Sequence, residues 1–175
     1  MKKLLSIIGI LLVAQFSTAG HHESGHSNKE VLIGYEMSDD GKKLEILAGD
    51  PALIKIWTDY VEAHNQRDLE AIDKANAEDM IGRAPNGVIV RGSKEHADFL
   101  KNWFETSNPS WEFVYAMAND VPQEDGSIHH WITSSYKVTD TIEGEEIVAR
   151  EFFDVRIENK KIKEILVASR LVLSE

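Results

Sequence analysis

The sequence predicts an α+β domain in which three N-terminal helices pack on a strongly curved, mainly antiparallel sheet. Between positions 53 and 104 the apolar residues recur at helical spacing, whereas after Pro109 they alternate at the two-residue period of strands. Helices followed by a run of strands with short connections are typical of an α+β domain, because short connections join antiparallel neighbours. A curved sheet with helices across its open side encloses a cone-shaped cavity, and we expect this architecture.

The composition limits what the protein can be. A chain of 175 residues is long enough for one domain with short additions. It has 30 acidic and 19 basic side chains, and a net charge of −11 opposes binding to nucleic acids and to anionic membrane surfaces. Because the chain has no cysteine, disulfides, thiol catalysis and thiolate metal sites are excluded.

The first 19 residues have the pattern of a signal peptide. Lys2 and Lys3 precede the apolar run 4–16, and Ser17-Thr18-Ala19 supplies the small residues at which a signal peptidase cleaves. The run is too short to cross a bilayer comfortably. We therefore expect cleavage after Ala19, export to the periplasm or the medium, and no attachment to the membrane afterwards.

Residues 20–50 are predicted to be an extension of the domain. Residues 20–28 are polar and rich in histidine, and we expect a tail there; a histidine third from the new terminus would suit Cu(II), but a tail without metal is the simpler interpretation. Two strand-like runs, 30–35 and 43–47, flank the turn Ser38-Asp39-Asp40-Gly41. They form either a hairpin added to the sheet or a loosely packed arm.

The first predicted helix begins at Pro51, with Asp50 as its N-cap. Its mostly apolar stripe consists of Leu53, Trp57, Tyr60, Val61 and His64. A polar turn at 65–68 leads to a short second helix with the stripe Leu69, Ile72 and Ala75, which Glu78-Asp79 ends. A strand, a turn at 84–87 and the short strand 88–91 are expected next.

The third helix is predicted to have Ser93 as its cap and to end at Asn108-Pro109. Its apolar stripe consists of His96, Phe99, Leu100, Trp103 and Phe104. The alternating pattern that follows predicts four longer strands, at 111–121, 128–138, 145–157 and 162–173. The breaks between them are short, so we expect antiparallel neighbours.

Several short motifs follow one another in a specific order. They are Trp57-x-x-Tyr60, the run Arg67 to Ile72, Glu78-Asp79, Pro85-Asn86-Gly87, Gly92, Val155-Arg156-Ile157 and Lys161-Ile162. Together they resemble the SnoaL-like branch of the nuclear-transport-factor-two-like superfamily over residues 52–171, and residues 51–175 are interpreted as one SnoaL-like domain. The resemblance implies a cystatin-like cone, in agreement with the fold predicted above, and a homodimer formed through the open sheet face.

The resemblance implies no single activity, because this fold carries isomerases, cyclases, epoxide hydrolases, dehydratases and binding modules. In a comparison with ketosteroid isomerase, Tyr60 takes the position of that family's oxyanion-hole tyrosine. The position of its general-base aspartate is occupied here by Ala84, and that of its protonated carboxylic acid lies near Arg150. Two of three roles are missing, so steroid isomerisation is not expected. Arg150, Asp154 and Asp140 partly resemble the Asp-Arg-Asp group of limonene epoxide hydrolase, and Asp154 is the candidate for the lone aspartate of SnoaL-type cyclases.

Four side chains are candidates for acid–base catalysis: Tyr60, His64, His130 and Asp154. Tyr60 and His64, one helical turn apart, point either into the cavity or to the half-buried end of an amphipathic helix. His130, Ser134 and Tyr136 share one face of their strand, which is either a pocket wall or a core edge. Arg150, Phe152 and Asp154 share a face of the next strand, taken as the cavity side, where Arg150 and Asp154 form an ion pair or Arg150 holds a ligand carboxylate.

The residues expected to contact a ligand are Trp57, Phe99, Trp103, Tyr136, Arg150 and Phe152. The leading hypothesis is an exported protein without cofactor or metal that binds a small apolar or amphipathic molecule in its cone. A second hypothesis is a cofactor-independent cyclase, hydratase or hydrolase that uses the four acid–base candidates. A third is a homodimeric interaction module without a ligand, which pairs through Phe153 and Val155 on the open sheet face.

Overall fold

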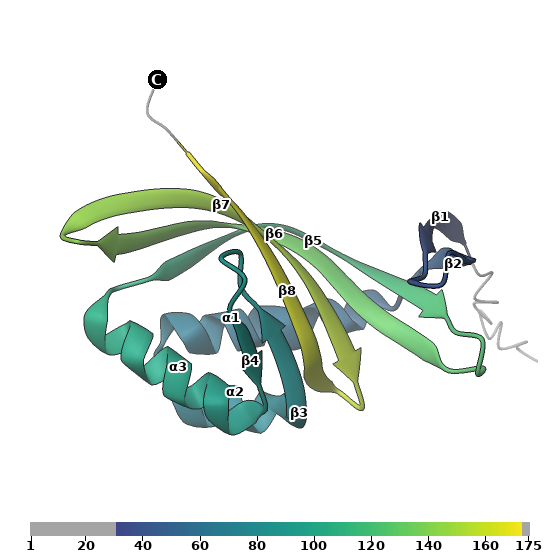
Figure 1. Ribbon diagram of the computed structural model, residues 1–175, viewed down its shortest axis with the longest axis horizontal. Helices are drawn as coiled ribbons and strands as arrows, with labels where there is room; N and C mark the ends of the chain where they lie inside the picture. Colours follow the sequence, from purple (N-terminus) through teal and green to yellow (C-terminus); the bar gives the residue numbers. More distant parts are fainter. Residues whose placement is uncertain (1–30, 173–175) are drawn as a thin grey trace, which may run out of the picture.

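The structure is a computed structural model that describes residues 31–172. The predicted signal peptide and the His-rich tail lie outside the described residues. Three helices cover one side of an arched eight-stranded sheet (Figure 1), so the predicted α+β architecture with its curved sheet is confirmed. Over the range that the structure describes, no helix is long and apolar enough to span a membrane.

The helices occupy the predicted positions, except that the second one ends earlier: it stops at Ala75, and Glu78-Asp79, its predicted end, lies in the strand that follows. A 3₁₀ turn at Pro51–Leu53 leads into α1 (Ile54–Asn65), which is followed by α2 (Leu69–Ala75) and α3 (Ser93–Thr106). The Asp50 side chain accepts a hydrogen bond from the Ala52 N–H, as expected of an N-cap. The predicted cap of α3 is wrong, because Ser93 is already its first residue.

Gly92 occupies the N-cap position of α3 with a φ of 85°, a conformation that glycine adopts without strain. A Cβ at Gly92 would lie 3.2 Å from the Glu78 carbonyl oxygen. The Ser93 hydroxyl donates instead to the Asp73 carboxylate, 2.5 Å away at the end of α2. Ser93 therefore ties α3 to α2 rather than capping its own helix.

The sheet has the order β1-β2-β5-β6-β7-β8-β3-β4. Its strands are β1 (Leu32–Met37), β2 (Lys43–Ala48), β3 (Asn76–Arg83), β4 (Ile89–Arg91), β5 (Ser110–Pro122), β6 (Ile128–Ile142), β7 (Glu145–Glu158) and β8 (Lys161–Leu171). All neighbours in this order are antiparallel except β3 and β8, which are parallel. The four long strands lie where the alternation predicted them, although β6 continues four residues further.

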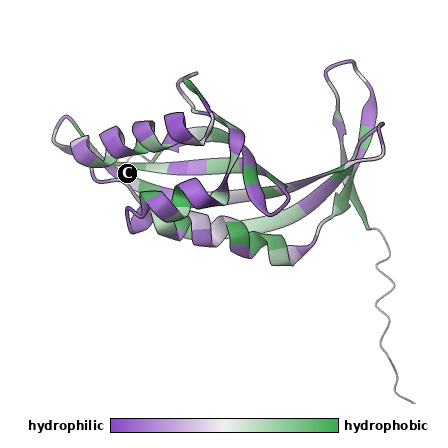
Figure 2. Cartoon of the chain, turned by 90° about the horizontal axis from the view of Figure 1, so that it is seen from below, coloured by the Kyte–Doolittle hydropathy of each residue, from purple (hydrophilic) through white to green (hydrophobic). Residues whose placement is uncertain are grey.

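Strands β1 and β2 form a hairpin at the far end of the sheet from β4. The hairpin joins the domain through the pairs Leu47↔Asp120 and Ala48↔Asn119 of β2 and β5, and it stands apart from the helices (Figure 2). Gly49 follows this junction so closely that a Cβ there would lie 2.8 Å from the Asn119 backbone nitrogen. The junction therefore requires glycine for close approach of two backbones.

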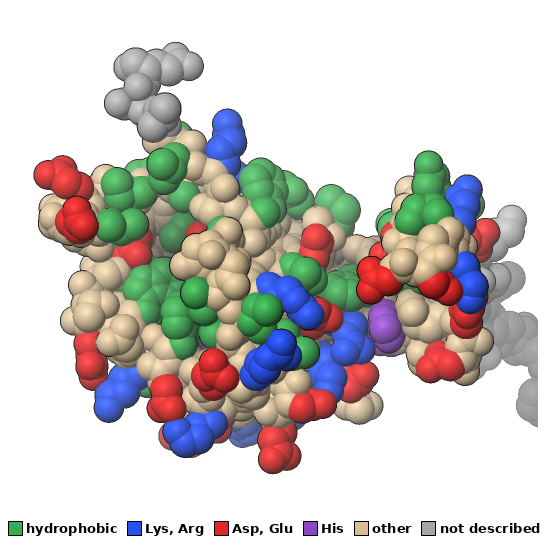
Figure 3. All heavy atoms as spheres, viewed as in Figure 1, with side chains coloured by type: hydrophobic (Ala, Val, Ile, Leu, Met, Phe, Trp, Pro, Cys, Tyr) green, Lys and Arg blue, Asp and Glu red, His purple; other side chains and the backbone are tan. Residues whose placement is uncertain are grey.

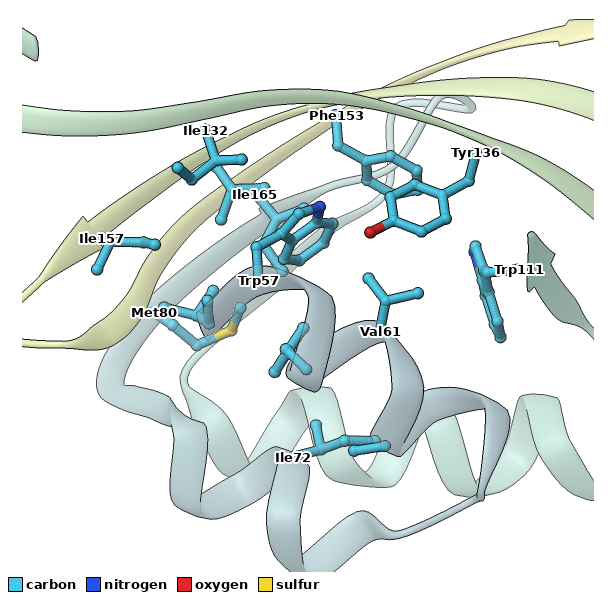
Figure 4. Close-up of a cluster of buried hydrophobic side chains, with 14 of the residues drawn as sticks. Trp57, Val61, Ile72, Met80, Trp111, Ile132, Tyr136, Phe153, Ile157 and Ile165 are labelled. Atoms are coloured by element: carbon cyan, nitrogen blue, oxygen red, sulfur yellow. The ribbon is translucent and has the colours of Figure 1, made fainter. Parts of the chain in front are cut away.

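The core lies between α1 and the face of the sheet that packs on the helices, which we call the concave face. Trp57 of α1 lies at its centre and is surrounded by side chains of β3 and of β6 to β8 (Figure 4). The buried residues of this core are Trp57, Tyr60, Val61, Ala63, Ile72, Met80, Leu100, Trp111, Ile132, Tyr136, Val138, Phe153, Val155, Ile157, Ile162 and Ile165. Figure 3 shows hydrophobic side chains gathered between the arched sheet and the helices.

The predicted assignment of the two faces of β7 is wrong. Phe153 and Val155 lie on the concave face with exposed fractions of 7% and 0%, so neither is available for a subunit contact. Phe152, 41% exposed, lies with Arg150 and Asp154 on the opposite face, which we call the convex face. The helices cover the more apolar of the two faces, because burial of apolar area stabilises by about 25 cal/mol per Å².

Candidate functional site

A cleft with a volume of about 290 Å³ opens between α1 and the beginning of β5. Its lining residues are Thr58, Val61, Glu62, Asn65, Trp111, Phe113 and Tyr136. The Asn65 amide donates to the Trp111 carbonyl at 3.0 Å and accepts from the Trp111 N–H at 2.9 Å. Asn65 thus makes the hydrogen bonds that a neighbouring strand would otherwise make with this part of β5. These bonds also hold α1 and β5, the two walls of the cleft, at a fixed separation.

Tyr136 reaches the cleft from the concave face of β6. It is 2% exposed, and its hydroxyl is buried without a hydrogen-bond partner among residues 31–172. Figure 4 shows this hydroxyl directed at the space between Trp57 and Val61. Burial raises the pKa of Tyr136 to about 12, so the phenol keeps its proton and remains a donor. An unpartnered buried hydroxyl costs about 1–3 kcal/mol, and a ligand oxygen that reaches this hydroxyl from the cleft, by displacing the side chains around it, would remove that penalty.

Glu151 lies beside Tyr136 on the concave face. The two residues are directly opposite in the ladder between β6 and β7, which places their Cβ atoms about 5 Å apart. Burial raises the pKa of Glu151 to about 7; hydrogen bonding by the Trp111 side chain acts against this shift, and the charge of Asp140 adds to it. Both protonation states of Glu151 are therefore populated near neutral pH, as a general acid–base group requires.

Two predicted ligand contacts, Phe99 and Trp103, lie on α3 and pack against each other with ring centroids 5.7 Å apart and ring planes inclined at 54°. Phe99 is 38% exposed. The Trp103 indole donates to Asp140 at the end of β6, at 2.9 Å, and its ring meets Trp111 edge to face at 5.4 Å. Trp103 therefore connects α3 to the strands that carry the cleft, but neither residue lines the cleft itself.

Tyr60 and His64 lie in the buried layer between α1 and α3, and they do not form a hydrogen-bonded acid–base pair. The Tyr60 hydroxyl donates to the Asn76 Oδ1 at 2.8 Å, and the Asn76 amide contacts His96 Nδ1 at 3.1 Å. His64 Nδ1 bonds the backbone carbonyl of Tyr60 at 2.8 Å. Sequence reasoning missed the Asn76–His96 part of this cluster, because its members come from a helix, a strand and another helix.

Burial dominates the protonation of this cluster. It lowers the pKa of His64 to about 3 and that of His96 to about 4, and it raises the pKa of Tyr60. Hydrogen bonds then indicate the tautomers: His64 donates from Nδ1 to a carbonyl, and His96 accepts at Nδ1 from an amide. Both imidazoles are neutral, so the cluster is a satisfied part of the core.

The other two acid–base candidates lie elsewhere. His130 pairs with Asp120 of β5 at 2.8 Å, six residues along β6 from Tyr136 and therefore about 20 Å away. Asp154 accepts from the Thr133 hydroxyl at 2.7 Å on the convex face. The structure does not bring Tyr60, His64, His130 and Asp154 together around one void.

Arg150 and Asp154 do not form the predicted ion pair. Among the ion pairs of residues 31–172, none involves Arg150. Of the predicted ligand contacts, Tyr136 lines the cleft, Trp57 is buried in the core at 2% exposure, and Arg150 and Phe152 point away from the cone. Over the same range, no group of three or more His, Asp or Glu side chains is arranged to hold a metal ion.

Glu151 is the functional candidate that sequence reasoning missed. From Ile147 to Ile157 it is the single charged residue on a strand face that otherwise carries Ile147, Ala149, Phe153, Val155 and Ile157, and the other acidic residue of that face, Glu145, lies at the exposed start of the strand. A single carboxylate on an otherwise apolar strand face is unexpected, because an unpaired buried charge is costly. It indicates either that the face is not the buried one or that the carboxylate has a function. That signal was present in the sequence.

Comparison with solved structures finds proteins of the same shape. A proposed polyketide cyclase from Xanthomonas campestris is 18% identical, with a TM-score of 0.56 over 66% of this chain and 88% of that one. A LEH-like epoxide hydrolase from M. tuberculosis is 12% identical, with a TM-score of 0.56 over 67% and 82%. A proposed SnoaL-like polyketide cyclase from Shewanella denitrificans is 11% identical, with a TM-score of 0.54 over 69% and 92%.

No protein-family model and no curated protein matches the sequence. At sequence identities this low, the structural similarity demonstrates a shared fold and leaves the activity open.

Proposed function

Since this chain has the fold of the SnoaL-like and nuclear-transport-factor-two-like superfamily, we propose that it binds a small, uncharged, largely apolar molecule in the cleft between α1 and β5. The observation that carries this proposal is the Tyr136 hydroxyl, which is buried, protonated and without a partner beside that cleft. Ligand sites typically combine apolar walls with few polar groups that orient the ligand.

The lining of the cleft determines the chemistry of the ligand. Val61, Trp111 and Phe113 supply apolar and aromatic walls. Tyr136 donates a hydrogen bond and therefore suits a carbonyl or ether oxygen. Of the seven lining residues none is Lys or Arg, whereas Glu62 carries negative charge at the rim. An anionic ligand would meet repulsion there without a compensating cation.

Three probes of matched size test this ligand class: acetophenone, ethylbenzene and benzoate, titrated by protein-observed NMR. We expect acetophenone to bind at least about fivefold more tightly than ethylbenzene, since one hydrogen bond is worth about 1 kcal/mol, and benzoate to bind most weakly. In Tyr136→Phe the preference for acetophenone over ethylbenzene is lost, while the variant is about 1 kcal/mol more stable than the native protein because the unpartnered hydroxyl is gone.

The chain provides a matched control for this experiment. The Ser135 hydroxyl is also buried without a partner, but its strand neighbours Tyr115 and Phe152 place it on the convex face. We expect Ser135→Ala to leave the order of the three probes unchanged. If Tyr136→Phe still prefers acetophenone, or if no probe binds the native protein, the proposed site is wrong.

A second candidate function is cofactor-independent acid–base catalysis, and the raised pKa of Glu151 favours it. A carboxyl group that titrates near pH 7 can remove a proton from carbon beside a carbonyl and return it. Tyr136 would stabilise the enolate oxygen that forms, as a preorganised donor does. This pair replaces the four acid–base candidates that the sequence suggested, because Tyr136 and Glu151 are neighbours in the sheet.

Glu151→Gln tests the second candidate in two measurements. At pH 8 the variant should be more stable than the native protein by about 3 kcal/mol, whereas near pH 4 the two should be equal, because a raised native pKa destabilises only where the unfolded carboxylate is ionised. The native protein should also exchange the methyl protons of acetophenone into D₂O faster than buffer alone, and Glu151→Gln should not. Exposed Glu145→Gln is the control for both.

A stability difference without proton exchange would leave Glu151 as a structural acid and the protein as a binding module.

We propose further that the protein is exported and acts as a homodimer. Export is supported by the leader pattern of residues 1–19. Mass spectrometry of the mature N-terminus should find Gly20; an intact Met1 would contradict export by this route.

A further inference from the structure

The outer edge of β1 is unpaired within the described part of the chain, because β1 is the terminal strand of the sheet. The apolar side chains of β1 and of the residue before it are exposed over more than half of their surface: Val31, Leu32, Ile33, Tyr35 and Met37. β1 contacts β2 and stands apart from the helices (Figure 2). Hydrophobic side chains are visible on the hairpin in Figure 3.

The other exposed edges of the sheet, β4 and the free part of β5, have features that prevent pairing with a further strand. β4 is three residues long and includes Arg91. The free part of β5 is capped by Asn65 and is interrupted by an irregularity between Phe113 and Tyr115. Short length, charge, bulges and covering side chains are the usual means of protecting an edge. β1 has an irregularity only near Ile33, and from Gly34 to Met37 it is regular and contains one charged residue, Glu36.

The order of residues in β1 permits pairing with a second copy of the strand about Tyr35. In an antiparallel pair of two copies centred on this residue, Tyr35 would face Tyr35 and Glu36 would face Gly34, while Met37 would lie near Ile33 at the irregularity of the second copy. Apolar residues then meet apolar residues on one face, and the two glutamates do not oppose each other on the other face. An isologous contact requires this self-complementarity.

We propose that β1 pairs with β1 of a second copy of this chain around a twofold axis at Tyr35, which joins the two sheets edge to edge. The proposal replaces the predicted contact through Phe153 and Val155, which are buried. A lipid surface fits the hairpin less well, because its turn presents Asp39 and Asp40 and the Lys42 ammonium is paired with Asp40 and Glu124. The contact lies far from the cleft in sequence and uses none of its residues.

Crosslinking gives the most direct test, since the chain has no cysteine of its own. Residues that face each other in an antiparallel pair have Cα atoms about 4.5–5.5 Å apart, within the range of a disulfide. Mild oxidation should therefore convert Tyr35→Cys almost completely to a disulfide-linked dimer. Lys43→Cys, on the neighbouring strand, is the matched control and should stay monomeric on a denaturing gel.

Equilibrium sedimentation gives a second, independent test. Tyr35→Lys should raise the dimer dissociation constant at least tenfold without changing the circular dichroism spectrum, because the Tyr35 side chain is 61% exposed. Tyr115→Lys, on the convex face, should leave the dimer intact. The proposal is overturned if the native protein is monomeric, if Tyr35→Cys does not crosslink, or if Tyr115→Lys dissociates the dimer and Tyr35→Lys does not.

Discussion

Replacing Trp57 by alanine is expected to lower the free energy of unfolding by about 4 kcal/mol, the usual loss for a buried tryptophan. Its ring stacks on Tyr60 at a centroid distance of 5.5 Å and packs against Phe153 at 5.4 Å. Its indole N–H donates to the Ser134 hydroxyl at 2.8 Å, so truncation also leaves a buried hydroxyl unpartnered. Urea unfolding at pH 7, followed by circular dichroism, measures the loss.

Two further variants separate the contributions of Trp57. Trp57→Phe keeps most of the apolar area and removes the bond to Ser134, and we expect a loss of about 1–2 kcal/mol. Trp131→Ala removes a half-buried tryptophan from the convex face of β6 and should cost less than half as much as Trp57→Ala. If Trp57→Ala instead remains stable and loses affinity for acetophenone, Trp57 is the cavity wall that the sequence suggested.

The fold could be predicted because each element carries its own periodic signal. The stripe from Trp57 to His64 identifies α1, and alternation identifies β5 to β8 within a few residues. The faces of β7 were harder to assign, because Phe152 and Phe153 give each face one aromatic residue. The face with Val155 and Ile157 packs on the helices, since it buries more apolar area.

The candidate site could be predicted only in part, because its residues meet through strand register. Tyr136 was recognised from the polar groups that alternate along β6, but its pairing with Glu151 depends on how β6 and β7 align. Asn65 belongs to a segment that reads as a polar turn, and its bond to Trp111 spans 46 positions. A single sequence carries no signal for such contacts, whereas it does show Glu151 as an isolated charge among apolar residues.

Two kinds of buried group, the histidines His64 and His96 and the carboxyl group of Glu151, have opposite effects on how stability depends on pH. His64 and His96 have lowered native pKa values, so the unfolded chain takes up protons first as the pH falls below 6.5, and stability is lost. Glu151 has a raised native pKa, so the native state takes up its proton first between pH 7 and pH 4.5, and stability is gained. The histidine effect must therefore be measured with Glu151 held constant.

We expect each buried histidine to remove up to about 2 kcal/mol of stability between pH 7 and pH 5. In a Glu151→Gln background, urea midpoints should fall steeply over this interval, and additional His64→Asn or His96→Asn should each remove about half of the fall. Asparagine keeps a hydrogen-bonding group near the position of Nδ1 but does not titrate. His129→Asn, outside the core, is the control and should leave the slope unchanged. If the urea midpoint still depends on pH as steeply after both core substitutions, the two imidazoles are protonated in the native state. The assignment of Tyr60, Asn76, His64 and His96 as a neutral cluster would then be wrong.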